Sequence, residues 1–360
     1  MRIALISSWN TQCGIAEYSR YLSEALVRQG GQLTILANFP VRDVSWARDE
    51  TYVCRFFHTG WHQERGVDVE AALRRIGERR VELVHLQYQD FLYPPPFLKN
   101  LPRLIERVPL VVTFHDPGVP SDFPREMVSA AIFHTPLNAG LVGRYGWRRV
   151  GIIPMGIHDR PDVPRETARV RLGINSRHVL CSAGLGRTSY ETVLPALSEL
   201  VKEYQDLLYF IISPRERTVS LPDQIRALRL QHHVCLVDGF PPVDKLYEFL
   251  HAADIGLFYY PEFGVAGVTS AASRLGIASR RPVILTDVEL TRDLPDQLKL
   301  PFGDLEQLKQ RLRLLWEDDG CRSTVLRLQE TLIQNYSWEQ TAERHMSLYH
   351  QVLHDHTVGK

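Results

Sequence analysis

Short apolar runs alternate with amphipathic stretches along most of the chain. The first half holds several runs with the length and near-continuous hydrophobicity of buried strands, at 2–7, 32–37, 81–86, 110–114, 131–134 and 152–154. Between the first two runs, the stretch 16–29 places Tyr18, Leu22 and Leu26 at helical spacing. This alternation is typical of a parallel β-sheet that helices cover on both faces.

The alternation restarts after a stretch rich in charge and proline at 159–171, which we interpret as a linker. Further strands are predicted at 177–183, 208–212, 234–237, 255–259 and 282–285. Further helices are predicted at 191–203, 246–253, 269–278, 305–316 and 321–336. The pattern therefore predicts two α/β halves, and sheets of this kind bind ligands at the carboxyl ends of their strands.

The composition is that of an ordinary globular protein. A length of 360 residues suggests two domains. Lys plus Arg and Asp plus Glu number 42 each, and a net charge of zero argues against a dedicated nucleic-acid-binding protein. The chain has no apolar run long enough to cross a membrane, and its first residues resemble a strand more than a signal peptide.

The five cysteines are far apart and form no CxxC pair or Cys/His cluster. Their spacing predicts neither a disulfide framework nor a zinc site. A cytoplasmic protein fits this usage best.

Polar residues follow the predicted strands of the first half. Gly14 lies in the turn after the first strand, where a glycine lets backbone N–H groups approach an anion. Gln87 and Tyr88 follow the strand at 81–86, and His115 and Asp116 follow the strand at 110–114. Taken singly, each has a simpler interpretation as an ordinary turn, a solvated loop or a structural histidine.

The second half carries similar features. Arg187 follows the strand at 177–183 in a Gly-rich loop, and an arginine beside a helix start suits a phosphate. Glu262, Phe263 and Gly264 follow the strand at 255–259, and Thr269 or Ser270 caps the next helix. The loop at 184–189 is only a weak match to a dinucleotide fingerprint, because its third glycine is missing.

Taken together and in order, these features resemble the GT-B glycosyltransferases, most closely the retaining family-4 group. The resemblance covers nearly the whole chain. Besides the Gly14 loop, its markers are the stretches at 111–116, 153–157, 252–256, 262–264 running to 281–283, and 336–339.

The resemblance implies an α/β fold of two Rossmann-like domains that face each other across a cleft. Residues 1–160 would form the acceptor-side domain, 161–336 the nucleotide-sugar-side domain, and 337–360 a helix crossing back to the first domain. It further implies that a sugar passes from a nucleotide diphosphate, most often UDP or GDP, to a glycan, glycolipid or small-molecule acceptor. Retention of the anomeric configuration, without metal or other cofactor, is part of this implication.

Matching residue by residue, the resemblance assigns three groups of site residues. The catalytic positions are His115 and Glu262. The positions that contact the donor diphosphate and sugar are Gly14, Arg187, Phe263, Gly264, Thr269 and Ser270. The positions that contact the acceptor or sugar are Gln87, Tyr88 and Asp116.

Two departures from the family pattern fall in the donor half. The family usually has a lysine shortly after the Arg187 region, whereas Thr188, Ser189 and Tyr190 stand here. The family also places two glutamates eight residues apart, at positions that Pro261 and Thr269 occupy. The departures leave open an alternative class, a non-catalytic GT-B-like protein that acts as a scaffold, glycan-binding or regulatory partner.

The sequence also offers replacements for the missing lysine and a basic surface for membrane contact. Arg215 and Arg217 are local cations that could replace the missing lysine. Pairs of arginines at 74–75, 79–80 and 148–149 would suit peripheral contact with the cytoplasmic face of a membrane. A solvated helix face or loop is the simpler interpretation of each pair.

Overall fold

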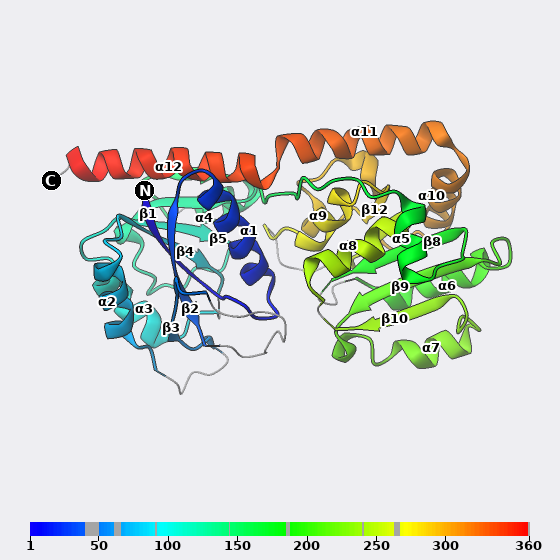
Figure 1. Ribbon diagram of the computed structural model, residues 1–360, viewed down its shortest axis with the longest axis horizontal. Coiled ribbons are helices and arrows are strands. Elements are labelled where there is room, and N and C mark those ends of the chain that lie inside the picture. The colour runs from blue at the N-terminus through cyan, green and yellow to red at the C-terminus, as the bar shows by residue number, and fades with distance from the viewer. Residues whose placement is uncertain are drawn as a thin grey trace. The chain divides into compact units, whose positions relative to one another are not determined.

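The computed structural model describes residues 1–39, 50–60, 66–90, 92–143, 145–184, 188–239, 241–262 and 267–358. The chain splits into two compact units (Figure 1). Unit 1 comprises Met1–Gly156, Val265–Thr269 and Trp338–Lys360. Unit 2 comprises Ile157–Gly264 and Ser270–Ser337.

Unit 1 is built on a parallel sheet in the order β3-β2-β1-β4-β5-β6-β7. Its strands are β1 (Arg2–Ser7), β2 (Gln32–Asn38), β3 (Val53–Phe57), β4 (Leu83–Tyr88), β5 (Leu110–Phe114), β6 (Val128–Phe133) and β7 (Val150–Ile152). The central strands are buried along their length, which is why they appear in the sequence as apolar runs without alternation.

The helices of unit 1 connect these strands and cover the sheet. They are α1 (Gly14–Arg28), α2 (Val69–Glu78), α3 (Pro95–Leu104), α4 (Pro136–Gly143) and, from the end of the chain, α12 (Trp338–Val358). The last helix packs against α1, so residues more than 300 positions apart lie side by side in this unit. There Arg28 of α1 donates a hydrogen bond to Glu339 of α12 over 2.7 Å.

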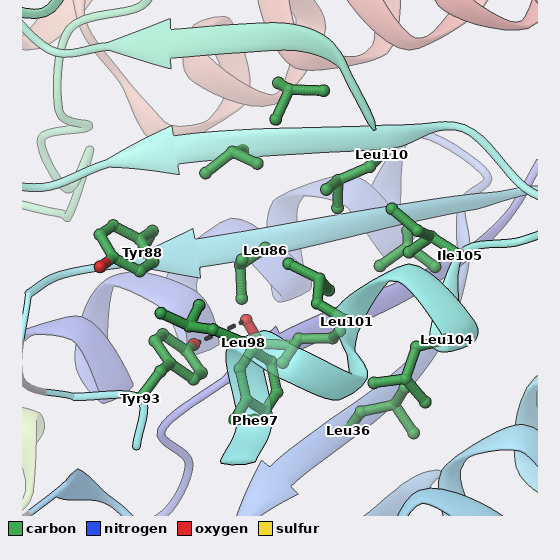
Figure 2. Close-up of a cluster of buried hydrophobic side chains, with 14 of the residues drawn as sticks. Leu36, Leu86, Tyr88, Tyr93, Phe97, Leu98, Leu101, Leu104, Ile105 and Leu110 are labelled. Atoms are coloured by element: carbon green, nitrogen blue, oxygen red, sulfur yellow. Dashed lines mark hydrogen bonds between the residues drawn. The ribbon is translucent and has the colours of Figure 1, made fainter. Parts of the chain in front are cut away.

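The main core of unit 1 lies where α3 packs on the sheet (Figure 2). Phe97, Leu98 and Leu101 of α3 pack in one buried cluster with Leu86 of β4 and Leu110 of β5. Each buried side chain of this size contributes roughly 1.5–3 kcal/mol relative to an exposed one.

Unit 2 repeats the arrangement. Its parallel sheet has the order β10-β9-β8-β11-β12-β13. The strands are β8 (His178–Ala183), β9 (Leu207–Ser213), β10 (Val234–Asp238), β11 (Ile255–Phe258), β12 (Val283–Thr286) and β13 (Lys299–Leu300). The helices are α5 (Arg165–Leu172), α6 (Tyr190–Leu200), α7 (Leu221–Ala227), α8 (Val243–Ala252), α9 (Ala271–Ala278), α10 (Leu305–Glu317) and α11 (Asp319–Asn335).

Both sheets therefore follow the doubly wound order in which the third, second, first, fourth, fifth and sixth strands are neighbours. The order reverses between β1 and β4 in unit 1 and between β8 and β11 in unit 2. Such a reversal leaves a crevice at the carboxyl ends of the two strands, and that is where ligands bind in this architecture.

The predicted α/β class with two parallel sheets is confirmed. Six elements were not predicted, namely β3, β13, α2, α3, α4 and α7. The predicted linker at 159–171 is wrong in its second half, where α5 begins at Arg165. Little of α5 is apolar, and Ala168 is its buried residue. The helix is held instead by charge, because Arg165 and Arg169 both bond the carboxylate of Asp254.

Two stretches that carried the resemblance have structural roles. Asp254, in the stretch 252–256, is 9% exposed; besides the two arginines of α5 it accepts a hydrogen bond from the backbone N–H of Val179 over 2.6 Å. In unit 1, Gly156 lies against Trp338, and a Cβ at Gly156 would come within 2.4 Å of the indole ring. The position of the Trp338 ring therefore depends on a residue without a Cβ at position 156.

Candidate functional site

The carboxyl ends of β4, β5 and β6 bring polar side chains together in unit 1. Phe114 and Phe133 pair in the last rung of β5 and β6, so the residues that follow them, His115 and His134, are neighbours. Gln87 lies near the end of β4, opposite Thr113. The predicted catalytic His115 thus stands among side chains from three strands.

Both ring nitrogens of His115 lie within hydrogen-bond distance of protein groups. Its Nε2 is 2.9 Å from the Gln87 amide, and its Nδ1 is 3.2 Å from Nε2 of His134. Nδ1 of His134 lies 3.0 Å from the carbonyl oxygen of Ile153. Burial lowers the pKa of His115 well below its usual value, and the neighbouring His134 lowers it further. His115 is therefore a neutral imidazole at pH 7.

Aromatic rings flank the two histidines. The ring of Tyr18 in α1 meets His115 edge-on with centroids 4.8 Å apart, and its centroid lies 5.2 Å from that of His134. Trp338 of α12 lies on Tyr18 at 5.2 Å. The Tyr18 hydroxyl is buried without a hydrogen-bond partner among the described residues, and burial raises its pKa far above the usual value. These rings exclude water from one side of the histidine pair.

Asp116 follows His115 and is 7% exposed. It accepts a hydrogen bond from the backbone N–H of Gly118 over 3.0 Å. Burial raises the pKa of Asp116, whereas hydrogen bonds from the backbone N–H groups of Gly118 and Asp90 oppose the rise. A Cβ at Gly118 would lie 2.8 Å from Asp90, so the glycine lets the loop pass close to both carboxylates. Asp116 can accept hydrogen bonds from ligand hydroxyl groups at this end of the sheet.

The other predicted acceptor residues are buried. Gln87 is 0% exposed, and its amide lies between His115 and His85. Tyr88 is 1% exposed and packs on Phe114 and Phe123. Their predicted contact with a sugar stays a prediction, and the structure gives each side chain an internal role.

Gly14 is exposed at the first position of α1. Cys13, the residue before it, is extended and gives no side-chain cap. The first turn of an α-helix has N–H groups without an intrahelical acceptor, and together with the helix dipole they attract anions. This helix start has N–H groups that could receive a phosphate, and the predicted role of Gly14 stays a prediction.

In unit 2, Ser270 is the N-cap of α9, and its side chain accepts a hydrogen bond from the Ser273 N–H over 3.0 Å. The same hydroxyl lies 2.8 Å from the Tyr260 hydroxyl. Arg274, one turn into the helix, is 4% exposed, bonds the Ser270 carbonyl and pairs with Asp293. Arg274 and Asp293 therefore stabilise the start of α9, and the Ser270 hydroxyl is already hydrogen-bonded within the protein.

The remaining donor residues divide into described and undescribed ones. Glu262 is exposed, four residues beyond the end of β11. The Thr269 hydroxyl is buried without a hydrogen-bond partner among the described residues. Arg187, Phe263 and Gly264 lie outside the described residues. Their assignments stay predictions.

Cations are present at the carboxyl end of the unit 2 sheet. Arg215 and Arg217 form a short 3-10 turn two residues beyond β9, and both are exposed. Asp238, at the end of β10, fixes this turn by accepting the backbone N–H of Arg215 over 2.8 Å. These are the arginines that the sequence offers in place of the missing lysine.

Sequence reasoning missed three functional candidates in unit 1, namely His85, His134 and Tyr349. His134 could have been found, because it ends a predicted strand as His115 follows one. His85 and Tyr349 give no local signal, since their partnership depends on how α12 lies against the sheet.

In the part of the chain that the structure describes, no group of three or more His, Cys, Asp or Glu side chains is placed to hold a metal ion. No helix there is long and apolar enough to cross a membrane.

Comparison with solved structures identifies the fold. The chain is similar to sucrose-phosphate synthase from Thermosynechococcus elongatus, with a TM-score of 0.77 and 16% identity over 98% of this chain and 99% of that chain. It is similar to HepE from Anabaena in complex with UDP, with a TM-score of 0.72 and 13% identity over 98% and 100%. It is also similar to a UDP-forming α,α-trehalose-phosphate synthase from Burkholderia vietnamiensis, with a TM-score of 0.69 and 14% identity over 99% of each chain.

No protein-family model matches the sequence, and no curated protein matches it by sequence. At these identities the likeness is one of fold. The chain has the GT-B fold of two doubly wound units, as the sequence predicts.

Proposed function

We propose that this protein is a glycosyltransferase that moves a sugar from a nucleotide diphosphate to a glycan, glycolipid or small-molecule acceptor. The observation that carries the proposal is a GT-B fold that matches nucleotide-sugar enzymes over 98% of the chain. HepE, one of these neighbours, has been solved with UDP and with UDP-glucose, which favours a UDP-linked donor here.

The proposed reaction builds negative charge on the leaving diphosphate. Such charge is stabilised by N–H donors and cations that are in place before the reaction. In unit 1 the uncapped start of α1 at Gly14 offers groups of the first kind. In unit 2 Arg187, Arg215 and Arg217 are the proposed cations. Thr269, Ser270, Phe263 and Gly264 would complete the donor site.

In unit 1 the proposed sugar contacts His115, and its hydroxyl groups donate to Asp116. In unit 2 Glu262 is the proposed catalytic residue. A neutral histidine suits this place, because the reacting sugar gains positive charge at its anomeric carbon. Retention of configuration without a metal is part of the proposal, on the strength of the family resemblance.

The location is a further part of the proposal, a cytoplasmic protein with peripheral membrane contact. Arg74, Arg79 and Arg80 are exposed on and just after α2, as an anionic lipid surface requires. Co-sedimentation with vesicles of anionic and of neutral lipids tests this part. Equal binding to both would remove it.

Calorimetry with a panel of nucleoside diphosphates and their sugar conjugates tests the main proposal. One conjugate should bind saturably and be hydrolysed or transferred. Arg187→Ala should weaken the binding of that conjugate by about tenfold or more, because a charge-assisted contact is lost. Arg226→Ala is the matched control, because Arg226 is an exposed residue of α7 paired with Asp223.

If the folded protein binds no member of the panel, the proposal fails. A non-catalytic GT-B-like scaffold or regulatory partner would then describe the protein better. Binding without turnover, with Arg187→Ala unchanged, would refute the assignment of the donor site.

A further inference from the structure

A row of buried hydrogen-bonding side chains runs through unit 1 to His115. It begins in α12, where the Tyr349 hydroxyl lies 2.6 Å from Nδ1 of His85 in β4. Nε2 of His85 lies 2.7 Å from the hydroxyl of Thr113. Tyr349, His85 and Thr113 are each 0% exposed, so bulk water does not reach these groups.

The row continues along β4 into the site. Nε2 of Gln87 lies 3.0 Å from Nε2 and 3.2 Å from Nδ1 of His85, and Oε1 of Gln87 lies 2.9 Å from Nε2 of His115. Nδ1 of His115 then faces His134, whose own Nδ1 faces the carbonyl oxygen of Ile153. Tyr349 and Ile153 are the two ends of one connected path.

The Ile153 end fixes the direction of the protons. A carbonyl oxygen only accepts, so Nδ1 of His134 carries a proton, and in a neutral ring its Nε2 is then an acceptor. Nδ1 of His115 must therefore donate to His134, and a neutral His115 has a lone pair on Nε2. That lone pair requires a donor from Gln87.

The Tyr349 end imposes the same direction. Among the described residues the hydroxyl proton of Tyr349 has one acceptor, Nδ1 of His85. Neutral His85 then carries its proton on Nε2, from which it can donate to the Gln87 amide oxygen or to Thr113. Both ends of the path therefore require the Gln87 amide oxygen to accept from His85 and the Gln87 amide N–H to donate to His115.

The Gln87 amide meets both requests in one of its two orientations. The structure places the amide oxygen toward His115, and a His115 ring that also donates from Nδ1 would then carry a proton on each nitrogen and be a buried cation. With the amide group turned over, His85, His115 and His134 can all be neutral, and the N–H group of each ring has an acceptor. The oxygen and nitrogen of an amide have nearly the same shape, so the hydrogen bonds decide between the two orientations.

We propose that Tyr349, His85 and Gln87 are positioning residues that hold His115 as the neutral imidazole with its proton on Nδ1 and an acceptor at Nε2. The path gives His115 a fixed ring orientation and withholds a proton from the nitrogen that faces Gln87. What this achieves in catalysis rests on the proposed function: a sugar hydroxyl that replaces or joins Gln87 must donate to His115. The tautomer itself does not depend on any activity.

Long-range proton–nitrogen correlation spectra of the full chain, with 15N-labelled histidine at pH 7.5, test the proposal. The His115 signals are assigned by their loss in His115→Asn. Nε2 of His115 should show the shift of an unprotonated nitrogen and Nδ1 that of a protonated one. A protonated Nε2 in the unsubstituted protein overturns the proposal.

Gln87→Glu reverses the demand on His115, because a carboxylate accepts at both oxygens. His115 should then be protonated on both nitrogens at pH 7.5. Gln32→Glu is the matched control, since Gln32 is exposed at the start of β2 in the same sheet. Unchanged His115 signals in folded Gln87→Glu would also overturn the proposal where the infrared spectrum shows the introduced carboxyl group to be ionised, because a protonated carboxyl can donate as the amide does.

Tyr349→Phe tests whether the far end matters. The chemical shift of Nδ1 of His85 should lose its hydrogen-bond contribution, and the shifts of His115 should change by a smaller amount. The value of kcat/KM should fall by about three- to tenfold, the loss expected for one hydrogen bond. Tyr247→Phe, which removes a buried hydroxyl of unit 2 that has no partner among the described residues, should change none of these. Unmoved His85 and His115 signals in Tyr349→Phe would remove Tyr349 from the path.

The spectra keep this proposal separate from the proposed function. A protein that turns over no sugar nucleotide but shows the expected His115 tautomer refutes the function alone. An active enzyme with protonated Nε2 refutes the positioning alone.

Discussion

The two units bury polar groups in different ways, although their sheets share one strand order. Unit 1 buries neutral groups, among them His85, Gln87, Thr113 and Tyr349, and satisfies them with hydrogen bonds. The ion pairs in the described part of unit 1 join side chains that are each at least 20% exposed.

Unit 2 buries charges instead. Asp254 is shared by two arginines, and Arg274 and Lys309 are 4% and 5% exposed with carboxylate partners. The difference teaches that a doubly wound sheet does not dictate the chemistry of its polar interior. Removing a partner costs more where the partner left behind is charged.

The largest expected effect is the loss of a buried charge in unit 2. Asp254→Ala leaves Arg165, Arg169 and the Val179 N–H without their acceptor. We expect unit 2 to lose about 3–5 kcal/mol of unfolding free energy. Hydrogen exchange read by mass spectrometry measures each unit separately, and protection of unit 1 should change little.

Asp244→Ala is the control for this prediction. Asp244 pairs with Arg160 but is 79% exposed, so its removal should cost no more than about 1 kcal/mol. An Asp254→Ala protein as stable as Asp244→Ala would show that unit 2 does not depend on its buried charges.

The next effect concerns packing in unit 1. Gly156→Ala places a methyl group within 2.4–2.8 Å of the Trp338 ring, so α12 has to shift. We expect a loss of about 2–3 kcal/mol, in the upper part of the range for overpacked cores. Faster exchange of 338–358 would report it.

Gly140→Ala is its matched control. Gly140 lies in α4 with nothing within 4 Å of an added Cβ, and should gain about 0.5–1 kcal/mol from the better helix former. Equal effects of the two substitutions would refute the contact between Gly156 and Trp338.

Lowering the pH should reduce the unfolding free energy of unit 1 more than that of unit 2, by a somewhat smaller amount than the substitutions above. Burial lowers the pKa of His345 to about 4 and the pKa values of His85 and His115 well below the usual value. Unfolded histidines titrate near pH 6.5, so below that pH the unfolded chain binds protons that folded unit 1 does not bind. The unfolding free energy of unit 1 is therefore greatest above pH 7 and should fall by about 3 kcal/mol by pH 5.5, about 1 kcal/mol for each of the three histidines.

In the described part of unit 2 one histidine is comparable, His251, whose pKa burial lowers to about 4. Unit 2 should therefore lose about a third as much between pH 7.5 and 5.5. Urea unfolding followed by hydrogen exchange, corrected for the intrinsic effect of pH, measures both. His345→Gln should reduce the slope of unit 1, and an unchanged slope would show that His345 is not buried neutral.

The smallest expected effect is at the cap of α9. Ser270→Ala removes the acceptor for the Ser273 N–H and should cost about 1 kcal/mol. Ser270→Asp keeps an acceptor and should recover most of the loss. If Ser270→Ala changes donor binding without changing stability, the hydroxyl serves a ligand more than the helix.

Much of the fold could be predicted because buried parallel strands are apolar along their whole length. The strand at 110–114 was predicted with its observed ends for that reason. The segment with β3 and α2 was not predicted, since β3 is short and only partly buried. The helix α5 was read as a linker because its stability comes from Asp254, some 85 residues away.

The site was predictable where it follows strand ends. His115 was found by that rule, and His134 obeys the same rule. The role of Gln87 was not predictable, because it depends on the alternation of side chains in β4, which places His85 and Gln87 on one face. Tyr349 was beyond reach of any local pattern, since its partner is 264 positions away.

The place of α12 in unit 1 has a consequence for how the protein is made. Residues 1–156 leave the ribosome early, but Trp338 and Tyr349 follow only after the whole of unit 2. At 5–20 residues per second the wait is about 10–40 s. During that time His85 lacks its hydroxyl partner and Gly156 its indole ring, so a nascent unit 1 offers a temporary surface to chaperones that the finished protein closes with its own last helix.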